Sequence, residues 1–243
     1  MDGYLFELYG DGMDRLTLRP LAHACNCTIP PGPDSELWLG GTRFDGMTPE
    51  QALPEAKKAL ALLNGLARLE NPQHGIVELG DTYRHNGTVH HIRHPPRPRR
   101  GSLVQEFQSP MLGPGLWAVP PTDAAALRRA HIVADPSLAE ILEVLAAPEM
   151  TWQKQRFAFE KIIALIGRNE NALVKNKYAT SDEVTRFKKN VEDPRHSGID
   201  AVHGVPTGRL KGTKMTEEEG FDFVVRLFNA YVDRHPGEGG LRK

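Results

Sequence analysis

The sequence predicts an α+β fold in which an N-terminal strand-helix-hairpin layer is followed by an all-helical bundle. Three observations favour this class. Short extended segments separated by turn residues dominate residues 1–101, a Pro- and Gly-rich stretch covers residues 102–122, and helical periodicity runs through residues 123–243. We therefore expect an α+β domain at 1–101, a linker at 102–122 and a helical bundle domain at 123–243.

The N-terminal segment contains several candidate strands. Residues 4–9 (YLFELY) alternate apolar and acidic character and stop at a Gly-Asp-Gly turn. The Asn86-Gly87 pair between two extended stretches is a strong signal for a two-residue hairpin. We expect strands at residues 4–9, 16–27, 36–39 and 75–79, and a hairpin formed by residues 82–85 and 88–94.

One long helix is expected within this layer. Thr48 is a candidate N-cap, Pro49 suits the first helical position, and Gln51 completes a capping box. Leucine and alanine then recur at helical spacing as far as Leu69. Because this apolar stripe is wide, the helix is expected to pack on a sheet.

The C-terminal half shows helical signals throughout. Thr180 with Glu183 and Thr216 with Glu219 form two further capping boxes, each followed by an apolar stripe. Prolines are frequent between residues 95 and 121, which excludes a long helix there. The expected helices cover residues 123–130, 137–145, 152–166, 184–191 and 221–232.

Composition restricts the functional classes. The 243 residues carry 30 Lys and Arg against 31 Asp and Glu, a formal net charge of -1, which argues against a globally basic nucleic-acid binder. No apolar run approaches the roughly 20 residues needed to cross a bilayer, so no membrane partner is expected. Two cysteines form no disulfide framework. A cytoplasmic protein is expected.

The charge is unevenly distributed, because residues 84–100 contain five Arg and four His and no acid. A solvated hairpin rim and a local phosphate-contacting patch are both compatible with this composition. In the second interpretation, prolines hold the segment extended while arginines neutralise phosphate charge. The residues of this candidate nucleic-acid-binding patch are Arg93, Arg97, Arg99 and Arg100.

Neither the histidines nor the cysteines predict a metal site. A metal centre needs several convergent ligands, and one strand face of the hairpin offers only His90 and His94. His23, Cys25 and Cys27 resemble half of a site, but no second cysteine pair completes it. We interpret both cysteines as small buried strand residues, and we expect neither a metal nor another cofactor.

The catalytic candidates lie in the segment DPRHSGIDAVHG, between two predicted helices. It contains Arg195, His196 and His203 within one Gly-containing stretch. An Arg beside a His is the minimum set for RNA cleavage by 2′-hydroxyl attack, because the His accepts the proton while the Arg stabilises charge on the phosphate oxygens. Alternatively, Asp193 or Asp200 pairs with one of these histidines, or the histidine caps a backbone carbonyl.

The runs TWQKQRFAFEKIIALI, ATSDEVTRFKKNVEDPRHSGIDAVHG and KMTEEEGFDFVVRLFNAYVD resemble the end of a family of uncharacterised bacterial proteins, and LLNGLARLENPQHGIVELGDTYRHNG extends the likeness to the N-terminal half. The C-terminal part is similar to HEPN domains, small helical bundles that include dimeric toxin and antiviral ribonucleases as well as non-catalytic members. The resemblance implies that His203 and Arg195 would form the Arg/His pair, although their spacing is longer than in the HEPN pattern.

Two main functional hypotheses follow. The first is an intracellular binding or adaptor protein with a HEPN-like helical domain, whose partner is another protein subunit or a second copy of the chain. A role in a bacterial defence or toxin-type system is compatible with this hypothesis. The second is a metal-independent HEPN-type endoribonuclease. Nucleic-acid binding through the local basic patch is compatible with either hypothesis.

Overall fold

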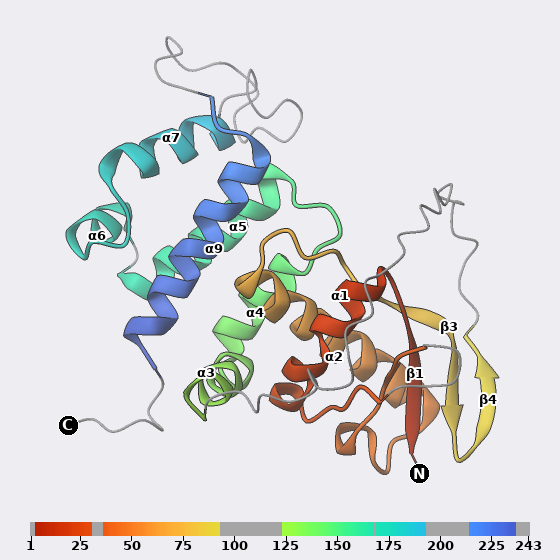
Figure 1. Ribbon diagram of the computed structural model, residues 1–243. Helices are drawn as coiled ribbons and strands as arrows, with labels where there is room; N and C mark the ends of the chain where they lie inside the picture. The colour runs from red at the N-terminus through yellow and green to blue at the C-terminus, as the bar shows by residue number, and fades with distance from the viewer. Residues whose placement is uncertain (1–2, 31–35, 93–122, 168, 193–213, 237–243) are drawn as a thin grey trace, which may run out of the picture.

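The computed structural model describes residues 3–30, 36–92, 123–167, 169–192 and 214–236. It shows the predicted α+β architecture, with an antiparallel sheet and a long helix in the N-terminal part and helices from residue 123 onward (Figure 1). The predicted linker at 102–122 lies outside the described residues. In the part of the chain that is described, no helix is both long and apolar enough to cross a membrane.

The sheet has the strand order β2-β1-β3-β4, with all neighbours antiparallel. Its strands are β1 (Tyr4–Tyr9), β2 (Trp38–Leu39), β3 (Glu78–His85) and β4 (Thr88–His91). Alternation buries Tyr4, Phe6 and Leu8 on one face, which we call the inner face. The register places the alternate residues on the opposite face, which we call the outer face: Leu5, Glu7, Trp38, Thr82, Arg84 and Val89.

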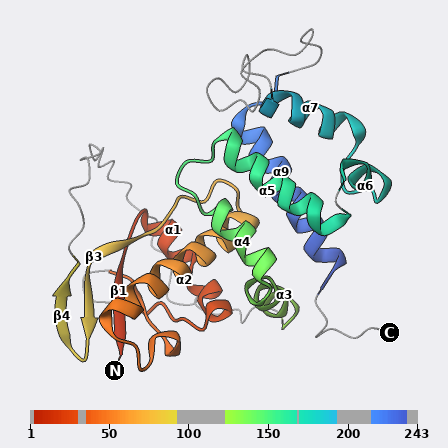
Figure 2. The same ribbon diagram turned by 180° about the vertical axis from the view of Figure 1, so that it is seen from behind.

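The predicted long helix is confirmed as α2 (Pro49–Glu70), which begins with the expected capping box of Thr48 and Gln51. It packs on the inner face of the sheet (Figures 1 and 2). The Tyr4 hydroxyl donates to the Met47 carbonyl at 3.1 Å and so ties β1 to the loop before α2. The Asn86-Gly87 hairpin is confirmed between β3 and β4.

One predicted strand is wrong. Residues 16–27 do not extend but form the end of helix α1 (Gly12–Thr17) and the 3₁₀ helix η1 (Arg19–Cys25). Asp11 caps α1 by accepting from the Met13 amide, Pro20 stands at the start of η1, and Asn26 ends it with φ 54°. The cap at Asp11 and the proline at residue 20 therefore begin helical turns in a segment that was expected to be extended. The strand expected at residues 75–79 begins only at Glu78.

The second half is helical as predicted. Its helices are α3 (Asp123–Ala134), α4 (Pro136–Leu145), α5 (Trp152–Ile166), α6 (Glu170–Lys175), α7 (Ser181–Glu192) and α9 (Glu217–Arg234), of which α6 was not predicted. An aromatic cluster of Trp152, Phe159, Phe187 and Phe223 joins α5, α7 and α9.

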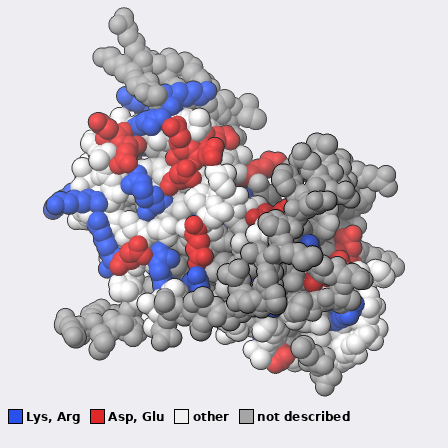
Figure 3. Space-filling model, viewed as in Figure 1, with Lys and Arg blue, Asp and Glu red and all other residues white. Residues whose placement is uncertain are grey.

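A continuous hydrophobic core runs from the sheet into the helices. Helix α4 packs directly on α2, where Gly65 allows close approach, because a Cβ there would lie 2.5 Å from the Leu142 carbonyl oxygen. Acidic and basic side chains are interspersed over the face of the helical part in Figure 3, in keeping with the near-zero net charge.

Candidate functional site

All the site residues predicted from the sequence lie outside the described residues. These are the catalytic candidates Arg195, His196 and His203 and the basic-patch residues Arg93, Arg97, Arg99 and Arg100. Their roles therefore stay predictions. In the described part of the chain, the candidate sites are the hairpin, the outer face of the sheet and the buried polar clusters.

The hairpin histidines are tied to aromatic rings. His85 stacks on Tyr4 with ring centroids 4.1 Å apart, and His90 stacks on Tyr83 at 4.8 Å, which places both histidines on the inner face. His91 follows His90 and so faces the outer side. Within the described ranges, no group of three or more His, Cys, Asp or Glu side chains is arranged to hold a metal ion.

Cys25 and Cys27 are buried, as predicted, but they flank the end of a 3₁₀ helix and not a strand. The Cys27 thiol donates to the Cys25 carbonyl at 3.4 Å, and Arg43 donates to the same oxygen. Burial raises the pKa of Cys25 to about 11 and that of Cys27 to about 12, against a lowering effect of Arg43. Both thiols are therefore protonated at neutral pH and unsuited to nucleophilic or ligand chemistry.

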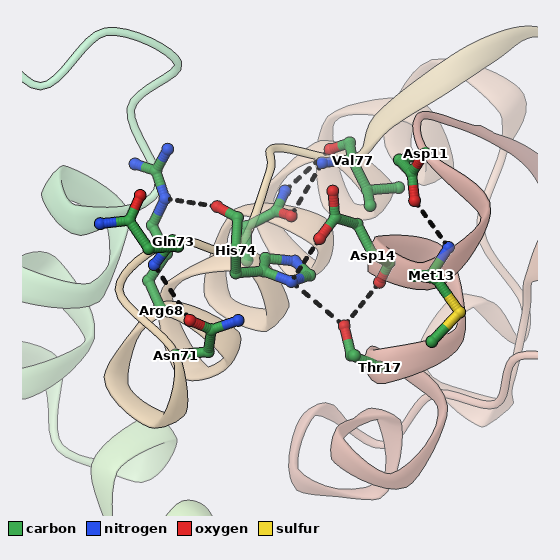
Figure 4. Close-up of polar contacts among 10 residues, drawn as sticks. Asp11, Met13, Asp14, Thr17, Arg68, Asn71, Gln73, His74 and Val77 are labelled. Atoms are coloured by element: carbon green, nitrogen blue, oxygen red, sulfur yellow. Dashed lines mark hydrogen bonds and ion pairs between the residues drawn. The ribbon is translucent and has the colours of Figure 1, made fainter. Parts of the chain in front are cut away.

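A buried polar cluster joins α1 to the loop that follows α2 (Figure 4). The His74 side chain is only 1% exposed, and its Nδ1 lies 3.2 Å from Asp14 Oδ1 and 3.1 Å from Thr17 Oγ1. Gly75 makes this arrangement possible, because a Cβ at this position would collide with the Asp14 carboxylate. The other ring nitrogen, Nε2, is buried and has no hydrogen-bond partner.

The hydrogen bonds of this cluster assign the proton. The Thr17 hydroxyl donates to the Asp14 carbonyl at 2.7 Å, so His74 Nδ1–H is the donor to Thr17 Oγ1, and the Asp14 carboxylate lies 3.2 Å from the same nitrogen. Burial lowers the pKa of His74, the Asp14 carboxylate raises it and the Arg68 cation lowers it, with a net shift downward. With its proton on Nδ1, the imidazole has no free lone pair facing Thr17. This geometry anchors the loop and does not activate Thr17 as a nucleophile.

Arg68 links the same loop to the helical part. Its guanidinium donates to the His74 carbonyl at 3.1 Å and to the carbonyls of Leu145 and Ala147 at 2.8 Å each. The Leu145 carbonyl belongs to the last residue of α4 and the Ala147 carbonyl lies just beyond it. The helix dipole favours a cation at this C-terminus. The guanidinium also lies 5.5 Å from the ring centroid of Phe221 in α9. Arg68 therefore connects three separate segments.

The outer face of the sheet carries a different pair. The guanidinium of Arg84 in β3 reaches across β1 and lies 4.6 Å from the ring centroid of Trp38 in β2. Arg84 Nε and Trp38 Nε1 are both buried and have no hydrogen-bond partner among the described residues. Glu7 lies on the same face, where its carboxylate accepts from the Thr82 hydroxyl at 2.6 Å.

Strand β4 forms the edge of the described sheet. The Ile92 amide donates to the Asp81 carbonyl, so the amides of Thr88 and His90 also face β3 in this antiparallel register. The backbone N–H and C=O groups of Val89 and His91 consequently point away from the sheet. Val89 is 50% exposed, and Thr88 and His91 are exposed as well.

The sequence places Arg84 in the basic segment and Trp38 in an expected strand, but it does not show that the two side chains meet. No local pattern connects these residues, which are far apart in the sequence. Asp14 and His74 are likewise distant in sequence and meet only through the packing of α1 on the loop after α2.

A comparison of the chain with protein-family models, with curated proteins and with solved structures found no match.

Proposed function

We propose that this chain is a binding or adaptor protein that accepts an extended segment of another protein along β4. The observation that carries the proposal is that the backbone N–H and C=O groups of Val89 and His91 point away from β3, on an exposed strand that no other described strand pairs with. A partner strand can form main-chain hydrogen bonds with both residues and extend the sheet, which is the mode called β-augmentation.

Two further features support this proposal. Exposed edges are commonly protected by Pro, Lys or a bulge, and the sequence Thr88-Val89-His90-His91 contains none of these. The segment from residue 84 to residue 100 carries Arg and His but no acid. This charge favours an acidic partner segment, because oppositely charged surfaces associate faster and reject like-charged competitors.

The proposal can be tested by removing one backbone donor. Val89→Pro deletes an N–H that faces away from β3, a position where an edge strand tolerates proline. Val89→Ala is the matched control, because it trims the side chain and keeps the donor. A protein captured from cell lysate by the full-length chain should bind Val89→Pro at least about tenfold more weakly and should bind Val89→Ala nearly as well as wild type.

Amide hydrogen exchange in the isolated complex supplies the second readout. The amides of Val89 and His91 should exchange rapidly in the free protein and slowly in the complex. Equal capture by wild type and Val89→Pro, or no protection at these two amides, would contradict the proposal. Capture that disappears after nuclease treatment would instead favour nucleic-acid binding through the basic patch.

A further inference from the structure

The outer face of the sheet contains a cation that the described residues do not neutralise. Arg84 is half-buried, lies over the Trp38 ring and forms no ion pair within the described part of the chain. The carboxylate of Glu7 is close in the register but is held by Thr82. Gly80 makes room for it, because a Cβ there would lie 2.7 Å from Glu7 Oε2. The positions of both charged groups are therefore defined by their neighbours.

Two hydrogen-bond donors of this pair are unused. Arg84 Nε and Trp38 Nε1 are shielded from solvent without an acceptor in the described part of the chain, and Trp38 is only 4% exposed. Buried N–H groups in proteins are paired in the large majority of cases, with protein atoms, ordered water or a ligand. Two unpaired donors within one stacked cation-aromatic contact thus indicate a position for an acceptor group.

The chemistry of the donors defines that acceptor. A guanidinium stacked on an aromatic ring keeps its in-plane N–H groups available, and these match the two oxygens of a carboxylate or phosphate. The indole N–H adds a donor that carries no charge. We infer that Arg84 and Trp38 form a binding site for an oxyanion, a carboxylate or phosphate group of a ligand, on the outer face of the sheet.

This site is independent of the proposed strand pairing at β4. The Arg84 side chain extends from β3 toward β2, away from the β4 edge. Failure of one proposal therefore leaves the other intact. Glu7 opposes an incoming anion, because like charges on one face repel each other. The affinity should consequently be modest in the wild-type protein and higher when the charge of Glu7 is removed.

The indole N–H resonance of Trp38 provides a direct test in the isotope-labelled full-length protein. Trp38→Phe identifies the signal by its loss. Titration with acetate, and separately with inorganic phosphate, should shift this resonance to saturation and leave that of Trp152, which lies in the helical core, unchanged. The anion with the higher affinity distinguishes a carboxylate ligand from a phosphate ligand. Sodium chloride at the same ionic strength is the control for general screening.

Variants at two positions complete the test. Arg84→Gln should weaken binding of the preferred anion by at least about tenfold, and Arg84→Lys should bind with intermediate affinity because it keeps the charge without the planar fork. Glu7→Gln should bind several-fold more tightly than wild type. An unchanged Trp152 resonance in each variant verifies that the fold is retained.

Three results would overturn the inference. They are the absence of a saturable shift with either anion, an equal shift with chloride, and an equal affinity in wild type and Arg84→Gln. Weaker binding by Glu7→Gln than by wild type would also contradict a site in which Glu7 opposes the anion.

Discussion

The N-terminal and helical parts of the molecule bury different kinds of side chain. Around α2, the buried polar residues include two titratable ones: Arg68, which donates to backbone carbonyls of the His74 loop and the end of α4, and His74, whose ring contacts Asp14 and Thr17. Among the described helices from α3 onward, the buried polar residues are the neutral amides Gln155 and Asn190 beside an aromatic cluster. The N-terminal part should therefore respond more strongly to loss of a single charge and to pH than the helical part.

Arg68→Met should have the largest effect of the substitutions considered. Methionine keeps the apolar stem but leaves the carbonyls of His74, Leu145 and Ala147 without their buried donor. The free energy of unfolding should fall by about 3 to 5 kcal/mol. Urea denaturation at neutral pH measures it. Lys161→Ala, which removes an exposed ion pair with Glu140 at 2.8 Å, is the control and should change the free energy by less than about 1 kcal/mol.

Substitutions at two glycines show how well the N-terminal part and the helical part each tolerate an added methyl group. Gly65→Ala places a Cβ against the Leu142 backbone between α2 and α4, whereas Gly220→Ala meets the side chains of Gln155 and Trp152. Alanine favours a helix by about 1 kcal/mol over glycine, but overpacking costs about 1 to 3 kcal/mol. Gly65→Ala should be the more destabilising in urea denaturation, because a backbone oxygen cannot rotate away. A larger loss for Gly220→Ala would contradict this comparison.

The helices were predictable because their signals are local. The capping boxes at Thr48 and Thr216 combine residues three positions apart, and the structure contains both. The strand expected at 16–27 was wrong because the cap at Asp11 and the proline at residue 20, which begin helical turns there, were not taken into account. The polar clusters could not be predicted, because each joins residues that are distant in sequence and meet only when strands, helices and loops pack together.

The pH dependence of stability should separate the two parts further. Burial is the main cause that lowers the folded-state pKa of His74, so the unfolded chain binds this proton more readily. Stability should therefore decrease as the pH falls below about 6.5, by at most about 1.4 kcal/mol per pH unit. His74→Asn should reduce this slope in urea denaturation between neutral and mildly acidic pH. An identical slope in the variant would show that His74 does not cause it.

The smallest change in the free energy of unfolding is expected for a substitution at the start of α7. Thr180 donates its hydroxyl to Glu183 at 2.9 Å and accepts from the Glu183 amide, so Thr180→Ala should reduce the free energy of unfolding by about 1 kcal/mol. Thr180→Ser keeps the hydroxyl and is the matched control. Burial raises the pKa of Glu183, but hydrogen bonds from Thr180 and Arg226 leave it below its usual value.

The lowered pKa of Glu183 gives the cap at Thr180 a pH dependence that differs from that of the His74 cluster. A lowered carboxylate pKa stabilises the folded state above the ordinary glutamate range, and the contribution is lost as the pH falls through the folded-state value. Thr180→Ala should therefore lose part of its pH dependence below about pH 4.5 and keep the slope near pH 6.5 that His74 produces. If Thr180→Ala altered the slope near pH 6.5 instead, the two parts of the molecule would be coupled through α7, and the contrast between them would not hold.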